Sequence, residues 1–117
     1  MRRDADKLGI LRGTLDILVL KSLAGRPLHG FEISLWLDDQ SNGTLHLDDS
    51  ALYQCLHRLE DRGYILGEWG VSGNNRRARY YRLTAAGRRH LAGESARLVS
   101  YARTLLGMLS ATPGTKP

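Results

Sequence analysis

One pair of strand-like segments, set in a chain of otherwise helical pattern, limits most strongly how this sequence can fold. Residues 64–69 and 78–83 are rich in aromatic and branched side chains, which favour β-strands. The segment between them is dense in glycine, serine and asparagine, and it is too long for a two-residue turn. The sequence therefore predicts one β-hairpin with an extended, flexible tip.

Two helical patterns precede this hairpin at the start of the chain. Thr14 is a candidate N-cap for a largely apolar and therefore buried helix, which we expect to stop at Gly25 because Pro27 follows. Residues 30–37 form the second segment. Their apolar side chains partly alternate, which makes a strand the alternative, but the length and the i, i+3 and i+4 spacing favour a helix. Residues 38–43 are turn-forming and predict a loop.

A third helix has the clearest signals at both ends. Asp48 or Asp49 can cap its N-terminus, where a carboxylate also complements the helix dipole. Leu52, Leu56 and Leu59 then form a buried stripe, with Cys55 beside it. Gly63 occupies the position of a left-handed C-cap.

A long helix follows the hairpin. Thr84 is its expected N-cap, the helix extends to about Leu109, and residues 111–117 are expected to be disordered. Three helices, a hairpin and a further helix indicate a mainly α fold with a small β-hairpin (α+β), the winged helix-turn-helix. We therefore expect a winged DNA-binding domain over residues 10–83, a C-terminal dimerisation helix over residues 84–110 and a tail over residues 111–117.

The composition narrows the classes of protein that this chain can belong to. Its 117 residues suffice for one domain, and the single cysteine, Cys55, cannot form a disulfide within the chain. No apolar run approaches the length of a membrane span, so a cytoplasmic protein is expected. Residues 1–53 carry six basic and eight acidic side chains, whereas residues 54–117 carry eleven and four. The basic second half favours a polyanionic partner such as double-stranded DNA.

Several short motifs together resemble the PadR family of bacterial winged-helix transcriptional regulators. They are LRGTLD (residues 11–16), HG (29–30), ALY (51–53), LHRLE (56–60), Gly63 and RYYRLTAAG (79–87). The resemblance covers residues 10 to about 95 and is closest to the compact branch with one C-terminal helix. It implies a homodimer that binds a pseudo-palindromic operator, usually as a repressor and often released by a small effector.

Two departures from the family pattern affect the presumed DNA-reading end of the third helix. Ser50 and Ala51 stand where a Gly-Ser or Gly-Thr pair is common, and Gln54 replaces the usual proline. Asp48 and Asp49 add two negative charges just before this helix, which could weaken DNA binding. An operator sequence therefore cannot be transferred from relatives.

The third helix and the hairpin contain the candidate DNA contacts. With the leucine stripe buried, a rotation of 100° per residue places Tyr53, Gln54, His57 and Arg58 on the outer side. Gln54 suits adenine edges and Arg58 suits guanine or phosphate, while Tyr53 and His57 suit phosphate oxygens. The full predicted set comprises Ser50, Tyr53, Gln54, His57 and Arg58 from the helix and Arg76, Arg77 and Arg79 from the wing. A solvated face without DNA contact is the alternative.

The last helix has the spacing of a self-association seam. Apolar or small residues recur in a heptad pattern over about three heptads. The predicted interface joins this helix to the first helix of a second copy, and its residues are Leu15, Leu18, Leu91, Leu98, Ala102, Leu105 and Leu109. In compact relatives the seam can also form a pore for an effector, often lined by tryptophan. The absence of tryptophan from this helix puts such a pore in doubt.

The remaining residues favour neither an enzyme nor a metal protein. The four histidines have no metal-ligand spacing with other donors, and His29 is expected to satisfy backbone groups in a turn. Neither a nucleophile with its base nor a phosphate-cradling loop is present, and no cofactor is expected. Tyr80, Tyr81, Trp36 and Trp69 are interpreted as packing residues. A winged-helix module that binds a protein and not DNA is the rival hypothesis.

Overall fold

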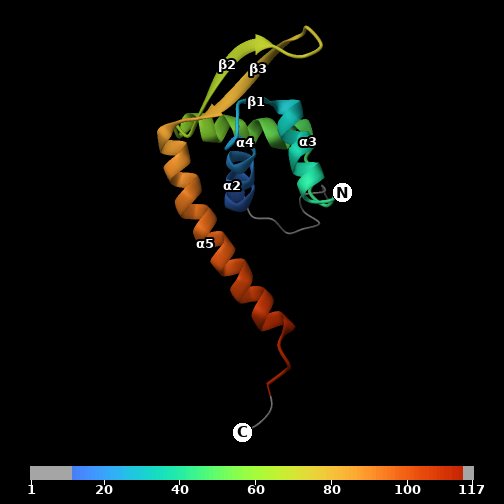
Figure 1. The fold of residues 1–117 in the computed structure, drawn as a ribbon, viewed down its shortest axis with the longest axis vertical. Helices are drawn as coiled ribbons and strands as arrows, with labels where there is room; N and C mark the ends of the chain where they lie inside the picture. The colour runs from blue at the N-terminus through green and yellow to red at the C-terminus, as the bar shows by residue number, and fades with distance from the viewer. Residues whose placement is uncertain (1–11, 115–117) are drawn as a thin grey trace.

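The computed structural model describes residues 12–114, and its elements follow the expected order with one addition. The helices are α2 (Arg12–Ser22), α3 (Gly30–Gln40), α4 (Asp49–Asp61) and α5 (Ala85–Ser110). The strands are β1 (Leu28–His29), β2 (Ile65–Val71) and β3 (Arg77–Leu83). The mainly α fold with a small antiparallel sheet, a winged helix-turn-helix, is therefore confirmed (Figure 1).

Local side-chain chemistry explains where most helices begin. The carboxylate of Asp48 accepts a hydrogen bond from the Ala51 N–H at 2.7 Å, and the Thr84 hydroxyl accepts one from the Gly87 N–H at 3.0 Å. Both residues are N-caps, as the sequence predicts. The prediction for Thr14 is wrong, because α2 already begins at Arg12.

The second helical segment is a helix and not the alternative strand. His29 is its N-cap: its Nδ1 accepts from the Glu32 N–H, while the Glu32 carboxylate accepts from the His29 N–H. This reciprocal pair is a capping box, and it confirms that His29 satisfies backbone groups at the turn. Ile33 and Leu37, one turn apart, are buried. The intervening Leu35 points to solvent, which is the pattern of a helix with one buried face.

The sheet has three strands in the order β1-β3-β2, all antiparallel. The hairpin register pairs Ile65 with Leu83 at its base and Val71 with Arg77 at its tip. The third strand, β1, pairs Leu28 with Tyr81 and was not predicted, because two residues carry no periodic signal. This strand ties the hairpin to the turn before α3, so the wing is attached on two sides.

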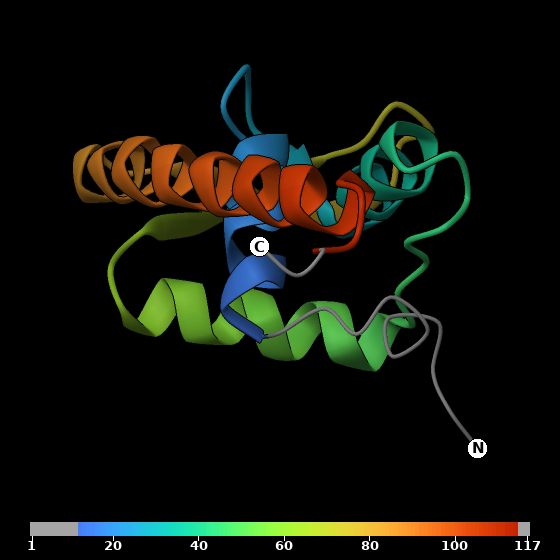
Figure 2. The same ribbon diagram turned by 90° about the horizontal axis from the view of Figure 1, so that it is seen from below.

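Helix α2 is the centre of the core. Val19 and Leu20 on this helix and Leu23 just after it are essentially inaccessible to solvent, and they pack with the leucine stripe of α4. Figure 2 shows α2 between α4 on one side and α5 on the other. Trp36 packs against this core, as expected, whereas Trp69 on the wing is 58% exposed.

Helix α5 begins in the core and leaves it. Gly87 is buried where the helix passes the backbone of Tyr64, and Leu91 is buried one turn later. Beyond Leu98 every residue of the helix is exposed, and the helix extends well away from the other elements (Figure 1). Residues 111–114 of the predicted tail follow without helix or strand. Residues 10 and 11 of the predicted domain and residues 115–117 of the tail lie outside the described part of the chain.

Candidate nucleic-acid interface

The orientation of α4 is fixed at both of its ends and along one face. Asp48 caps the N-terminus, and Gly63 adopts a left-handed conformation with φ of 77° just after the C-cap, as the sequence predicts. Leu52, Leu56 and Leu59 are each at most 1% exposed. The helix is thus held against α2 and β2 by its stripe, and its opposite face is free.

The free face of α4 presents side chains of mixed hydrogen-bonding character. Ser50, Tyr53, Gln54 and His57 are exposed, as predicted, and together with Arg58 they line an open hollow. The Gln54 amide can both donate and accept, which matches an adenine edge. His57 lies 3.5 Å from the carboxylate of Asp61, one turn further along the helix. These groups can read and hold a nucleic acid in a groove.

Arg58 differs from its predicted placement on the outer side. Its Nη2 donates to Asp16 Oδ1 on α2 at 2.7 Å, and the side chain is only 24% exposed. The hydrogen bond to Asp16 raises the pKa of the guanidinium above its ordinary value. The rotation rule gives the face of a helix but not the reach of a long side chain, and this one folds back toward α2.

Arg79 is also paired with a carboxylate. Its Nη2 donates to Glu60 Oε2 on α4 at 2.7 Å, and this hydrogen bond raises the pKa of Arg79. The contact joins the wing to α4, because Arg79 lies on β3. In the described structure Arg79 therefore braces the wing, and this role was not visible in the sequence.

The tip of the wing carries two further arginines, Arg76 and Arg77. The Ser72 N–H donates to the Arg76 carbonyl at 2.8 Å, and Asn75 adopts a positive φ of 61°, which closes the turn. Arg76 and Arg77 are exposed there, as the sequence predicts. The Arg77 guanidinium lies 4.4 Å from the centre of the Trp69 ring, a cation–π contact.

The first residue of α3 meets the N-terminal part of α4 at a close contact. Tyr53 packs over Gly30, where a Cβ atom would lie only 2.6 Å from the Tyr53 hydroxyl. Tyr81 is 5% exposed, and burial raises its pKa. Tyr80 stacks edge-on against His29 with ring centres 5.2 Å apart. Both tyrosines are therefore packing residues, as interpreted from the sequence.

The predicted seam residues fall into two groups. Leu91 lies in the core of its own protomer, and Leu15, Leu18 and Leu98 are partly buried against that core. Ala102, Leu105 and Leu109 are exposed on the projecting part of α5. For Leu91 this corrects the prediction: a side chain already surrounded by its own core offers little surface to a second copy.

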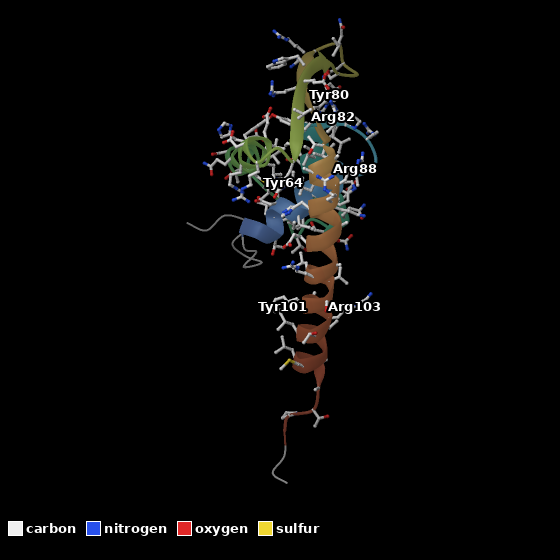
Figure 3. The ribbon with its side chains drawn as sticks, turned by 90° about the vertical axis from the view of Figure 1, so that its left-hand side faces the viewer. Tyr64, Tyr80, Arg82, Arg88, Tyr101 and Arg103 are labelled. Carbon is white, nitrogen blue, oxygen red and sulfur yellow. The ribbon has the colours of Figure 1, made fainter. Side chains whose placement is uncertain are left out.

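The two sides of projecting α5 differ in chemistry. Arg88 and Arg103 extend from one side of the helix and Tyr101 from the other (Figure 3). The arginine side borders a groove of about 790 Å³ that also includes Lys21 and Val99. The exposed apolar surface near the end of the helix includes Leu106 and Met108 as well.

The buried thiol and the histidines show no chemistry of a catalytic or metal site. Burial raises the pKa of the Cys55 thiol, so it stays protonated and unreactive. Its Sγ donates to Asp16 at 3.1 Å. Within residues 12–114, no cluster of three or more His, Cys, Asp or Glu side chains is placed to hold a metal ion.

Comparison with known proteins identifies the family. A sequence profile described as "Transcriptional regulator PadR-like family" matches residues 19–93. The chain belongs to the PadR-like family. Its members are transcriptional regulators and not enzymes. The match spans α3, α4, the wing and the buried part of α5, so it includes both elements of the candidate interface, α4 and the wing.

Individual relatives agree with this assignment. The transcriptional regulator Rv3488 of Mycobacterium tuberculosis is 34% identical over 104 residues, covering 88% of this chain and 92% of the relative. A crystal structure of a PadR family transcriptional regulator from Eggerthella lenta is 29% identical, with a TM-score of 0.73 and coverage of 92% and 91%. The fold alone is shared with a PadR-like regulator from Bacillus cereus, at 20% identity, a TM-score of 0.77 and coverage of 89% and 99%.

Among residues 12–114, no helix combines the length and the apolar character that a membrane crossing requires.

Proposed function

We propose that this chain acts as a homodimeric, sequence-specific DNA-binding repressor on a pseudo-palindromic operator. The observation that carries the proposal is the pairing of two exposed features at one end of the molecule. Ser50, Tyr53, Gln54 and His57 form an open polar face on α4, and Arg76 and Arg77 are exposed at the wing tip. Winged-helix domains bind DNA by placing one helix in the major groove and a cationic wing beside it.

The division of labour between these residues follows from their chemistry. Arg76 and Arg77 supply positive charge to the phosphate backbone or the minor groove, which provides affinity without regard to sequence. Gln54 and Ser50 supply hydrogen bonds to base edges, which provide specificity. Tyr53 and His57 bind phosphate oxygens and fix the register. Arg58 and Arg79, which hold Asp16 and Glu60, are left out of this set.

Dimerisation is supported by the exposed apolar end of α5. Leu105, Leu106 and Leu109 project into solvent beyond the core, and a second copy would cover them. A two-fold dimer would present its two α4 helices about 34–36 Å apart, one turn of B-DNA. Binding across a promoter would then exclude polymerase, which is why we propose repression.

The test measures affinity and its dependence on salt, using the intergenic DNA upstream of the gene for this chain and a random duplex of equal length. Binding through about six phosphates should weaken roughly a thousandfold between 50 and 200 mM salt. The Arg76→Ala, Arg77→Ala double variant should bind both duplexes more weakly and reduce the salt slope by about two. The control is the replacement of Arg88 and Arg89 on α5 by alanine, which also removes two positive charges but at positions outside the wing.

Gln54→Ala separates specificity from affinity. It should alter the bases selected from a random pool while leaving affinity for random duplex unchanged. Recovery of the parental motif from that selection would contradict the proposed base contact. Unchanged binding of random duplex by the wing variant would contradict the role of the wing.

A protein-binding winged helix remains the second candidate because of one feature. Asp48 and Asp49 are both exposed at the N-terminus of α4, where they repel phosphate. Binding of neither duplex at 50 mM salt, with the fold intact, would favour this candidate over the first.

A further inference from the structure

A buried carboxylate lies between the core helix and the proposed reading helix. Asp16 on α2 is 5% exposed, and its Oδ1 accepts two hydrogen bonds from α4. One comes from Cys55 Sγ at 3.1 Å and the other from Arg58 Nη2 at 2.7 Å. A charge removed from water in this way is costly unless it is paired, and this pairing crosses from one helix to the other.

The geometry of this contact is poor for stability alone. One carboxylate oxygen accepts both hydrogen bonds, and the buried Arg58 Nε has no hydrogen-bond partner among residues 12–114. In a bidentate pair, two nitrogens of the guanidinium would donate to the two oxygens of the carboxylate. Buried ion pairs of this kind often contribute no net stability over apolar packing, but they can specify one arrangement of the groups that they join.

The contact between Asp16 and Arg58 restricts the rotation of α4 about its own axis, which the apolar packing of this helix restricts least. The leucine stripe of α4 holds the helix by non-directional apolar contacts, which tolerate a small roll about its axis. A roll of about 10° moves groups on the helix surface by about 1 Å. Hydrogen bonds to base edges do not tolerate such a shift. Arg58 lies one turn from Gln54, so its position and that of the reading face change together.

We propose that Asp16 is a positioning residue for sequence readout: through Arg58 it fixes the roll of α4, and Arg58 itself does not contact DNA. The inference rests on the proposed DNA-binding function. It also connects regions that are far apart, because Asp16 borders a hollow shared with His90 and Leu98 of α5. Asp16 thus lies between α4, which carries Gln54, and a hollow that α5 also borders.

The experiment is a double-mutant cycle on the full chain. Asp16→Asn, Arg58→Met and their combination are each measured against the selected operator and against random duplex over a range of salt. Each single change should lower the ratio of specific to random affinity about tenfold, the discrimination that one well-placed base contact supplies. The double variant should be no worse than either single variant, and random affinity and salt slope should stay unchanged.

The control pair is on α5, where the exposed Arg97 lies 3.7 Å from the partly exposed Glu94. Glu94→Gln and Arg97→Met change the same kinds of charge on the α5 side of the hollow that Asp16 borders, without breaking the contact between Asp16 and Arg58, and should leave the affinity ratio at the parental value. Arg58→Lys keeps the positive charge but loses the planar guanidinium group. Compared with Arg58→Met, it should therefore restore only part of the parental ratio of specific to random affinity. This variant also serves if Asp16→Asn does not fold.

Two outcomes overturn the inference. If Arg58 contacts DNA, Asp16→Asn will release it and keep or raise affinity, whereas Arg58→Met will lower affinity and reduce the salt slope by about one. If all variants keep the parental ratio, the pair is a structural contact only. Failure of the parental protein to bind any duplex counts against the proposed function instead. In that case the NMR chemical shifts of the backbone amides of Tyr53, Gln54 and His57 decide. A change in these chemical shifts in the folded Asp16→Asn protein supports the inference, and unchanged chemical shifts overturn it.

Discussion

The two halves of α5 share one helix but have opposite surroundings. In the first half, Gly87 and Leu91 are buried and Leu98 is partly buried against the core of the protomer. In the second half, Leu106, Met108 and Leu109 are between 67% and 83% exposed. The difference shows that one heptad pattern can run from a buried into an exposed environment. The first half completes its own domain, and the second half has exposed apolar surface that the proposed dimer would cover.

The largest expected effect comes from removing the apolar surface of the second half. Changing both Leu105 and Leu109 to aspartate should convert the proposed dimer to monomers, because two charges would be buried in the seam. Sedimentation velocity measures the change in mass, and circular dichroism checks that the helices persist. Ser100→Asp, on the opposite side of the helix, should leave the dimer intact. A dimer that survives the double change would place the interface away from the end of α5.

The second largest effect is expected on stability, from a change in the first half of α5. In the monomeric Leu105→Asp, Leu109→Asp background, Leu91→Ala should lower the free energy of unfolding by about 2–5 kcal/mol, because it leaves a cavity in the core. Leu106→Ala, at an exposed position, should change it by less than about 0.5 kcal/mol. Denaturant titration gives both values. Equal effects at the two positions would remove the contrast between the halves.

A smaller loss is expected where α5 passes the end of α4. A Cβ at position 87 would collide with the carbonyl oxygen of Tyr64, which is backbone and cannot rotate away. Gly87→Ala should therefore destabilise the monomeric background by about 1–3 kcal/mol through overpacking. A neutral result in the same denaturant titration would show that the helix can shift outward at no cost.

The smallest expected effect has the opposite sign. A Cβ at position 107 would meet no atom within 4 Å. Gly107→Ala should stabilise the helix by about 0.5–1 kcal/mol, because alanine loses less backbone entropy than glycine. The gain is measured as increased helix content on heating the same background. A loss at this position would indicate that the second half packs where the described protomer leaves space.

Features set by short-range chemistry could be predicted from the sequence. The caps at Asp48 and Thr84, the left-handed Gly63 and the leucine stripe of α4 depend on residues within a few positions of each other. The same local logic predicted the exposure of Gln54 and of the wing arginines. It missed β1, which is too short to have a period. It misplaced the start of α2, where an apparent cap lies inside the helix.

Features set by long-range pairing could not be predicted. Asp16 lies 42 residues from Arg58, and Glu60 lies 19 residues from Arg79. Periodicity assigns a face to a helix, but it does not show which carboxylate will lie opposite an arginine once the chain folds. Both arginines therefore looked available for DNA. Which of the remaining exposed groups contact DNA stays a prediction until binding is measured.

The indole stacked beneath Arg77 gives the molecule an intrinsic optical probe. Trp69 is the more exposed of the chain's two tryptophans, and its ring lies 4.4 Å from that guanidinium. A cation over the face of an indole ring changes the fluorescence emission of that ring. Any event that draws Arg77 away from Trp69 toward an anion should therefore change the fluorescence of the unlabelled protein. Trp36, packed against the interior, would supply a constant reference signal. Engagement of the wing could thus be followed in real time, without dye, label or added chromophore.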